Sequence, residues 1–198
     1  MTSPRVSDHP IDPLFTRRWS PRAFTGEPIP RETLSTVLEA ARWAPSSFNS
    51  QPWRFIVGHR DTPAWAPIFD ALAEVNRGWA HRASALIVIV SRTQWVPPGK
   101  TEVEPLRSHS FDTGAAWASM AFQATMLGWH VHGIGGFDRD RVRASLGVPA
   151  DHAVEAVVAI GRQGDPSVLT DAQRAREMPN QRQPLAALVA EGRFDFPG

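Results

Sequence analysis

The sequence predicts an α/β or α+β fold in which one sheet is covered by helices. Apolar residues recur at helical spacing from Leu34 to Ala41, and this spacing predicts an amphipathic helix over residues 31–44. A continuous apolar run at 85–90 is typical of a central strand that is buried on both faces, and a second buried strand is expected over 153–160. Because helical and strand patterns alternate along the chain, we expect the two kinds of element to pack as layers.

The first part of the chain is expected to contain an N-terminal arm, a short helix, a strand and a further helix. Residues 1–13 are rich in charge and proline, and we expect a flexible N-terminal arm there, followed by one domain over residues 14–198. Leu14 and Phe15 anchor a short first helix. A strand is expected at 54–57 and a helix at 63–79, although Pro67 disturbs its start.

The second half continues with a long Ala-rich helix over 108–129 and a short strand over 131–134. Asp138 suits the N-cap of a further helix, and Gly147 suits its C-terminal end. A short terminal helix is expected over 184–191. The proline-rich segment 92–107 lies between a strand and a helix, and loops of this length are often lids.

Composition excludes several classes of protein. The 21 basic and 20 acidic residues give a net charge of +1 without a basic stripe, which argues against a nucleic-acid-binding protein. Cysteine and tyrosine are both absent, so no disulfide, thiol nucleophile or tyrosine acid is available. We find no secretory signal, and the longest aliphatic run is too short to span a bilayer. These features lead us to expect a cytoplasmic protein without membrane partners.

A stiff, neutral loop follows the first amphipathic helix, with the sequence Pro-Ser-Ser-Phe-Asn-Ser-Gln-Pro-Trp over residues 45–53. Its two prolines restrict the backbone, and its hydroxyl and amide groups can both donate and accept hydrogen bonds. Such a loop suits a planar heterocycle with donor and acceptor edges. The alternative is a capped turn whose polar side chains satisfy their own backbone.

Three further patterns could carry chemistry. Arg17, Arg18, Ser20 and Arg22 place converging guanidinium groups in one turn, which suits a phosphate, although a solvated basic turn fits the same residues. Gly135-Gly136 would let a ligand approach the backbone closely, but a plain turn explains it as well. His130 and His132 point to one side of a strand without a third ligand nearby, so we expect no metal site.

Taken in order, these segments resemble the FMN-dependent nitroreductase family. The motifs are Arg-Arg-Trp-Ser-Pro-Arg-x-Phe, then Ala-Pro-Ser-Ser-x-Asn-Ser-Gln-Pro-Trp-x-Phe, then Gly-Ile-Gly-Gly-Phe-Asp, and finally Arg-x-Pro-Leu near the C-terminus. The resemblance runs from about residue 17 to about residue 194. It implies a mixed sheet covered by helices on both sides, in an extensive homodimer with FMN at the interface.

The resemblance also implies a set of cofactor-binding residues. One subunit would contact the phosphate, ribityl chain and flavin edge, while the loop at 45–49 would reach the flavin from the other subunit. The residues implied are Arg18, Trp19, Ser20, Arg22, Pro45, Ser46, Ser47, Asn49, Asn76, Gly135, Gly136 and Arg182.

The chain departs from the family pattern at one position. Many members carry a lysine beside the flavin three residues after the asparagine that corresponds to Asn76, whereas this chain has Trp79. A cation there would stabilise the negative charge of reduced flavin. Arg22 could supply that charge instead, or the flavin potential could be lower.

The implied activity is electron transfer from NADH or NADPH, through flavin N5, to a nitroaromatic, a quinone or a similar conjugated acceptor. FMN does this chemistry, so no catalytic side chain is required. Trp95, in the 92–107 segment, is expected to shape the acceptor pocket, and the alternative is a surface loop without contact. Three other activities come into question: a flavin-binding or storage module, a flavin-cleaving relative, and a dehalogenating relative, which the absence of tyrosine disfavours.

Overall fold

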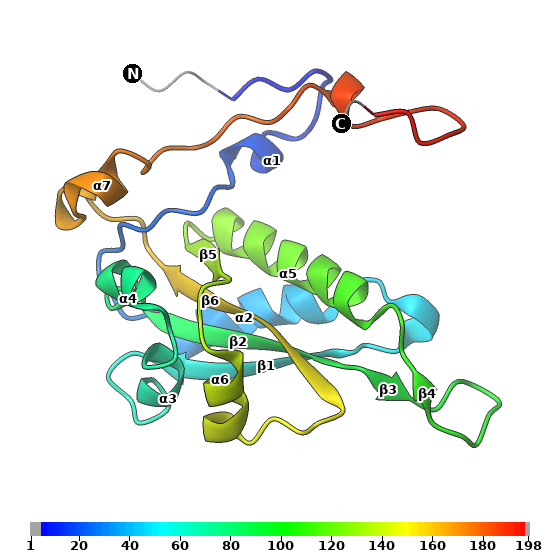
Figure 1. Ribbon diagram of the computed structural model, residues 1–198. Coiled ribbons are helices and arrows are strands. Elements are labelled where there is room, and N and C mark those ends of the chain that lie inside the picture. The colour runs from blue at the N-terminus through cyan, green and yellow to red at the C-terminus, as the bar shows by residue number, and fades with distance from the viewer. Residues whose placement is uncertain (1–4, 197–198) are drawn as a thin grey trace.

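The computed structural model describes residues 5–196, which form one four-stranded sheet with helices against both faces (Figure 1). The strands are β1 (Trp53–His59), β2 (Ala85–Arg92), β5 (His130–Ile134) and β6 (His152–Gly161). Their order is β1-β2-β6-β5, and every pair is antiparallel. The α+β class is confirmed. The sheet of the described residues is antiparallel instead of mixed: β1–β2 and β5–β6 are neighbours along the chain, and β6 runs antiparallel to β2 as well.

One face of the sheet is covered by α2 (Arg31–Arg42) and the long helix α5 (His109–Met126). Val37 of α2 and Met120 of α5 are fully buried there against Ile87 and Val158 of the sheet. The apolar side chains spaced three and four residues apart on α2 therefore lie on one buried stripe, as the sequence predicted. The fully buried strand β2 explains its continuous apolar run.

The other face carries the short helices α3 (Ala66–Phe69), α4 (Glu74–Ala80) and α6 (Arg139–Leu146). Asp138 accepts a hydrogen bond from the Arg141 amide at 2.9 Å, and Gly147 adopts a left-handed φ of 64° after the last turn of α6. Both predicted ends of this helix are confirmed.

The helix expected over residues 63–79 is wrong, because the chain breaks between α3 and α4. The break lies beside the segment that follows β5: the Ala73 amide donates to Gly136 O at 3.0 Å, and the Asp138 amide donates to Ala71 O at 2.8 Å. Leu72 also forms an isolated bridge with Phe137. These long-range backbone hydrogen bonds replace the local ones that a continuous helix would need.

Near the two termini, α1 (Pro13–Arg17) packs on α5, and residues 5–12 run beside the C-terminal segment without forming a helix or strand (Figure 1). Residues 1–4 of the expected arm lie outside the described residues, and the flexibility of the arm stays a prediction. The terminal helix expected over 184–191 is wrong, since only the 3₁₀ turn η3 (Leu185–Ala187) forms. Leu188 and Val189 are exposed, so no apolar packing stabilises a longer helix.

The remaining elements are short. The segment after β2 forms a hairpin of β3 (Gln94–Trp95) and β4 (Glu104–Pro105), and the loop after α2 contains the 3₁₀ turn η1 (Ser47–Asn49). A 3₁₀ turn η2 (Pro166–Val168) and a helix α7 (Asp171–Arg174) precede the C-terminal segment. Among the described residues, every helix is too short or too polar to cross a membrane.

Candidate functional site

The turn after α1 supplies the first part of the candidate site. Together with β5 and the C-terminal segment it encloses a cavity of about 580 Å³, which we name the basic corner. Five predicted residues lie on its wall: Arg18, Trp19, Ser20, Arg22 and Arg182. They come from opposite ends of the chain, so the structure brings together what the sequence separates by about 160 positions. Arg18 Nη1 donates to Ser20 Oγ at 3.3 Å.

The basic corner holds uncompensated positive charge. Burial and the neighbouring Arg182 lower the pKa of Arg18. Burial, Arg182 and Arg18 together lower the pKa of Arg5, which lines the same cavity. Within residues 5–196, none of these three guanidinium groups forms an ion pair with a carboxylate. Close cations without a counter-charge repel one another, and this repulsion favours the binding of an anion between them.

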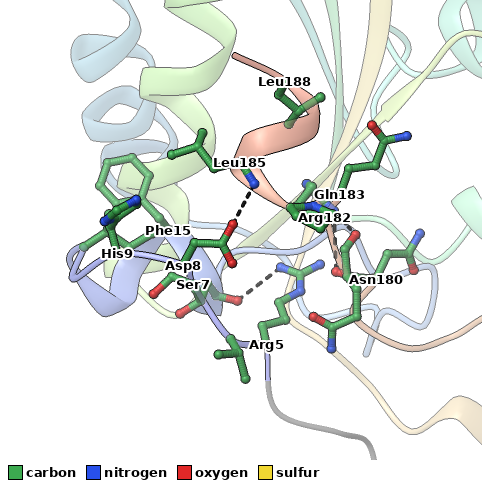
Figure 2. Close-up of a pocket in the computed structure, with 15 residues that line it drawn as sticks. Arg5, Ser7, Asp8, His9, Phe15, Asn180, Arg182, Gln183, Leu185 and Leu188 are labelled. Carbon is green, nitrogen blue, oxygen red and sulfur yellow. Dashed lines mark hydrogen bonds between the residues drawn. The ribbon is translucent and has the colours of Figure 1, made fainter. Parts of the chain in front are cut away.

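Arg5 reaches the basic corner from the N-terminal arm, where no sequence pattern indicated a ligand. Its Nη1 donates to Thr16 O at 3.1 Å and to Arg18 O at 2.6 Å, while its buried Nε has no partner. Figure 2 shows Arg5 and Arg182 on the wall of an adjoining cavity of about 410 Å³ between the arm and the C-terminal segment. There Asp8 accepts from the Leu185 amide at 2.6 Å and joins the two segments.

Glu177 organises the turn that carries the arginines. Its Oε1 accepts the backbone amides of Arg22 and Ala23 at 2.7 and 2.8 Å, and its side chain is buried. Arg22 Nη1 lies 3.8 Å from Oε2, at the limit of an ion pair. The carboxylate is therefore occupied by the backbone of the turn and leaves Arg18 and Arg182 unneutralised.

His132 is the second residue on this wall that sequence reasoning missed. Its Nδ1 lies 3.0 Å from Pro21 O, which can only accept, so Nδ1 carries the proton. Burial lowers the pKa of His132 to about 4, and the imidazole is neutral at pH 7. The alternation of His130 and His132 in a strand was the sequence pattern that could have indicated a side chain on this wall. Taken by itself, the pattern indicates only two histidines without a third metal ligand. No group of three or more metal-ligating side chains occurs in the described part of the chain.

Trp79 does not replace a flavin-facing lysine. Its side chain is 2% exposed and packs between Phe24 and His132, with ring centroids 6.2 and 4.6 Å away. The neighbouring Arg77 instead lines the crevice that holds Gly135 and Gly136. A cation is therefore present beside the double glycine, two residues before the expected position.

Gly135 and Gly136 follow β5 in a crevice of about 450 Å³. Asn76 Nδ2 donates to Gly136 O at 2.9 Å, so the structure brings together the predicted asparagine and double glycine. A Cβ at Gly136 would lie 2.8 Å from Asn76 Nδ2, whereas a Cβ at Gly135 would meet nothing within 4 Å. A Cβ at Gly136 would therefore displace the Asn76 amide, while Gly135 borders open space that a ligand could fill.

The loop at 45–51 is exposed and its backbone is strained. Phe48, Asn49 and Gln51 adopt left-handed φ angles of 49°, 54° and 46°. Such conformations are uncommon for residues other than glycine and cluster at functional sites. The Ser46 hydroxyl accepts the Gln51 amide at 3.1 Å, so Ser46 does cap its own loop. The Ser47 amide donates to Asp112 Oδ2 at 3.1 Å.

Within one chain this loop does not meet the basic corner. The loop precedes β1 beside the start of α5, and the basic corner lies where α1, α7 and the C-terminal segment converge (Figure 1). The remaining predicted contacts, Pro45, Ser46, Ser47 and Asn49, therefore stand apart from the first group. Trp95 lies nearer to the loop: its ring centroid is 6.0 Å from that of Phe48, and both line one cavity of about 480 Å³.

Comparisons with known proteins identify the family and the fold. A family model described as Nitroreductase family matches residues 15–74 and 58–162. An NADH dehydrogenase of Thermus thermophilus is 33% identical over 184 residues, covering 76% of this chain and 87% of its own length. A solved oxidoreductase containing FMN is 47% identical and superposes with a TM-score of 0.94 over 100% of both chains. A putative nitroreductase from Desulfovibrio desulfuricans, solved with FMN, is 23% identical, with a TM-score of 0.71 over 94% of this chain and 100% of its own, and shares the fold.

Proposed function

Because the chain belongs to the nitroreductase family, we propose that it is an FMN-dependent oxidoreductase that passes electrons from NADH or NADPH to a nitroaromatic, a quinone or a similar conjugated acceptor. The observation that carries this proposal is the basic corner, where Arg5, Arg18 and Arg182 meet without a carboxylate partner among the described residues. The similar solved oxidoreductase that contains FMN supports the identity of the anion.

The residues present fit FMN. In the proposed complex, the phosphate is held by Arg18, Arg182 and Ser20. Each guanidinium group can donate two parallel hydrogen bonds to two oxygens of one phosphate. Arg22 and Trp19 line the same cavity, where the ribityl chain would run from the phosphate towards the flavin ring. The flavin ring would lie in the crevice beside Gly135, where the backbone leaves open space. Asn76 donates a hydrogen bond to Gly136 O and so holds this segment in position. Arg77 supplies the cation for the flavin edge.

A second copy of the chain would complete the site. Ser47 and Asn49 stand on an exposed, strained loop away from the basic corner of their own chain. In a homodimer, the loop of one protomer would cover the flavin bound by the other. This arrangement gives the strained loop a function and explains why the two groups of predicted residues do not meet within one chain.

When bound, FMN supplies the chemistry, because N5 of its ring can accept a hydride and the reduced ring can pass electrons to an acceptor. The protein binds, orients and shields the ring. Arg77 and the amides at Gly135 and Gly136 would favour the added negative charge, as fixed donors do at an oxyanion site. His132 stays neutral at pH 7 and adds no charge of its own.

The absorbance spectrum of the purified protein, followed by anaerobic addition of NADH and of NADPH, tests this function. Flavin bands that bleach with a nicotinamide and return with a quinone or nitroaromatic are the expected result. Flavin bands that never bleach would favour the storage module. Irreversible loss of the flavin in the presence of oxygen would favour a flavin-cleaving enzyme. No flavin binding, even after incubation with FMN, would contradict the assignment.

A further inference from the structure

The third cavity of interest lies between the loop at 45–51 and the β3–β4 hairpin. It measures about 480 Å³, and its lining includes Ser47, Phe48, Trp95 and Arg107. The hairpin extends beyond the sheet at the end where α5 begins, so this cavity stands at the rim of the molecule (Figure 1). Because Ser47 is one of the proposed flavin contacts, the cavity adjoins the place where an acceptor would meet the flavin.

Phe48 gives this cavity an exposed aromatic ring. Its ring is 78% exposed, although Phe is a large apolar residue that normally lies in the core. Its backbone also adopts a φ of 49°, which glycine or asparagine adopts readily and phenylalanine rarely does. A large apolar residue that is both strained and exposed points to contact with another molecule.

Trp95 lies beside Phe48 on the hairpin. The two ring centroids are 6.0 Å apart and the ring planes meet at 43°. At that distance the rings touch each other, and no third ring fits between them. They form one continuous aromatic wall on which a planar acceptor can pack by its face or edge.

The charged groups around this wall differ in their partners. Lys100 is neutralised by Glu104, with Nζ and Oε1 2.5 Å apart. Asp112, nearby on α5, accepts the Ser47 amide and the Ser108 hydroxyl at 3.1 and 2.8 Å. Arg107 is exposed, lines the cavity and forms no ion pair within residues 5–196. The cavity therefore presents one available guanidinium group beside an aromatic wall.

Resting on the proposed oxidoreductase function, we propose that this cavity selects planar aromatic acceptors that carry a negatively charged substituent. The ring of the acceptor packs on Phe48 and Trp95, and its carboxylate or sulfonate binds Arg107. For a nitroaromatic, the reaction converts the nitro group, NADH and one proton to a nitroso group, NAD⁺ and one water. The nitro group gains two electrons and two hydrogens and loses one oxygen as that water.

Two acceptors of the same shape test the proposal, 4-nitrobenzoate and the neutral 4-nitrobenzamide. We expect kcat/KM to favour 4-nitrobenzoate in the natural protein. Arg107→Gln should lower kcat/KM for 4-nitrobenzoate by about three- to fivefold, as for an exposed ion pair, and leave 4-nitrobenzamide within about twofold. Arg107→Lys should restore most of the preference. An equal effect of Arg107→Gln on both acceptors would overturn the proposal.

The aromatic wall has its own test. Phe48→Asn removes the ring but keeps a residue that adopts the left-handed backbone, so loss of the ring is separated from loss of the loop. We expect it to weaken both acceptors alike. In the flavin-free protein, 4-nitrobenzoate should quench the fluorescence of Trp95, and Trp95→Phe should remove that part of the quenching. Quenching that is unchanged in Trp95→Phe would contradict the proposed wall.

The design separates this proposal from the function on which it rests. If neither NADH nor NADPH bleaches the flavin, the electron donor is wrong, and the flavin can be reduced by dithionite under argon. The rate at which each acceptor then restores the flavin bands still reports the charge preference. If the nicotinamide does bleach the flavin but Arg107→Gln leaves the preference for 4-nitrobenzoate intact, only the acceptor proposal fails.

Discussion

Arg18 and Arg17 are neighbours in sequence but differ in environment. Arg18 lines the basic corner and its pKa is lowered by burial and by Arg182, whereas Arg17 is exposed and outside the cavity. We predict that Arg18→Ala weakens FMN binding by roughly 10- to 100-fold, the usual worth of a charge-assisted phosphate contact. Arg17→Ala is the matched control and should bind FMN as the natural protein does. Fluorescence titration of the flavin-free protein measures both. Equal losses in the two variants would show general electrostatic attraction and no specific contact.

His132 provides a prediction about pH. Its folded pKa of about 4 lies below the ordinary value of about 6.5, so the unfolded chain binds the proton more readily. Stability from this group is therefore present above pH 6.5 and is lost as the pH falls towards 4. In His132→Gln, the loss of unfolding free energy between pH 7 and pH 4.5 should be smaller by roughly 1–3 kcal/mol. Urea unfolding at both pH values measures it, with the exposed His81→Gln as the control. An unchanged pH dependence in His132→Gln would contradict this account.

Substitutions at the two neighbouring glycines should have different effects, one on stability and the other on FMN binding. Gly136→Ala places a Cβ 2.8 Å from Asn76 Nδ2 and should displace that amide, so the lost hydrogen bond to Gly136 O should lower the free energy of unfolding by about 0.5–1.5 kcal/mol. Gly135→Ala meets nothing within 4 Å, so its stability should change by less than about 0.5 kcal/mol. FMN binding should nevertheless weaken in Gly135→Ala, because the methyl group enters the space proposed for the flavin. Unchanged FMN affinity in Gly135→Ala would place the flavin elsewhere.

At the scale of elements, Asp112 joins the first turn of α5 to the strained loop. Its buried carboxylate accepts the Ser47 amide and the Ser108 hydroxyl. We predict that Asp112→Ala speeds hydrogen exchange of the amides at residues 47–49, while α2 and β2 stay protected. Asp112→Asn keeps one oxygen acceptor and should have the smaller effect. Unchanged exchange in Asp112→Ala would show that the loop holds its shape without α5.

The elements that the sequence predicted correctly are those whose pattern is decided locally. Val37 and Leu34 recur at helical spacing in α2, and Asp138 and Gly147 mark the ends of α6, so neighbouring residues suffice to define both helices. The helix expected over 63–79 failed because Ala73 and Leu72 pair with the distant segment at 136–138. No local pattern reveals such pairing.

The residues of the candidate site also fall into two groups, those that a local pattern predicts and those that only the three-dimensional packing reveals. Arg18, Ser20 and Arg22 could be predicted because they stand in one turn, and Arg182 could be added only through the family resemblance. Arg5 and His132 were missed because their position in the basic corner depends on how the N-terminal arm and β5 meet in three dimensions. The burial of Trp79 between Phe24 and His132 could not be predicted from the sequence, because it is a property of the packed core.

At the scale of the whole molecule, the proposed homodimer predicts complementation between defective chains. Each site would take Arg18 from one chain and Asn49 from the other. A mixture of Arg18→Ala chains with Asn49→Ala chains should therefore form heterodimers with one intact site each, after unfolding and refolding together. If chains pair at random, half of the dimers are mixed, and about a quarter of the sites should bind FMN tightly. No recovery over the separate variants would show that the loop does not act across subunits.

The central claim is that the basic corner binds the phosphate of FMN. Titration of the flavin-free protein with FMN and with riboflavin tests it most directly, because the two ligands differ only in that phosphate. We predict that FMN binds at least about 100-fold more tightly than riboflavin at low salt, that higher salt reduces the difference, and that Arg18→Ala combined with Arg182→Ala largely removes it. Equal affinity for FMN and riboflavin would contradict the account and leave Arg5, Arg18 and Arg182 without a ligand.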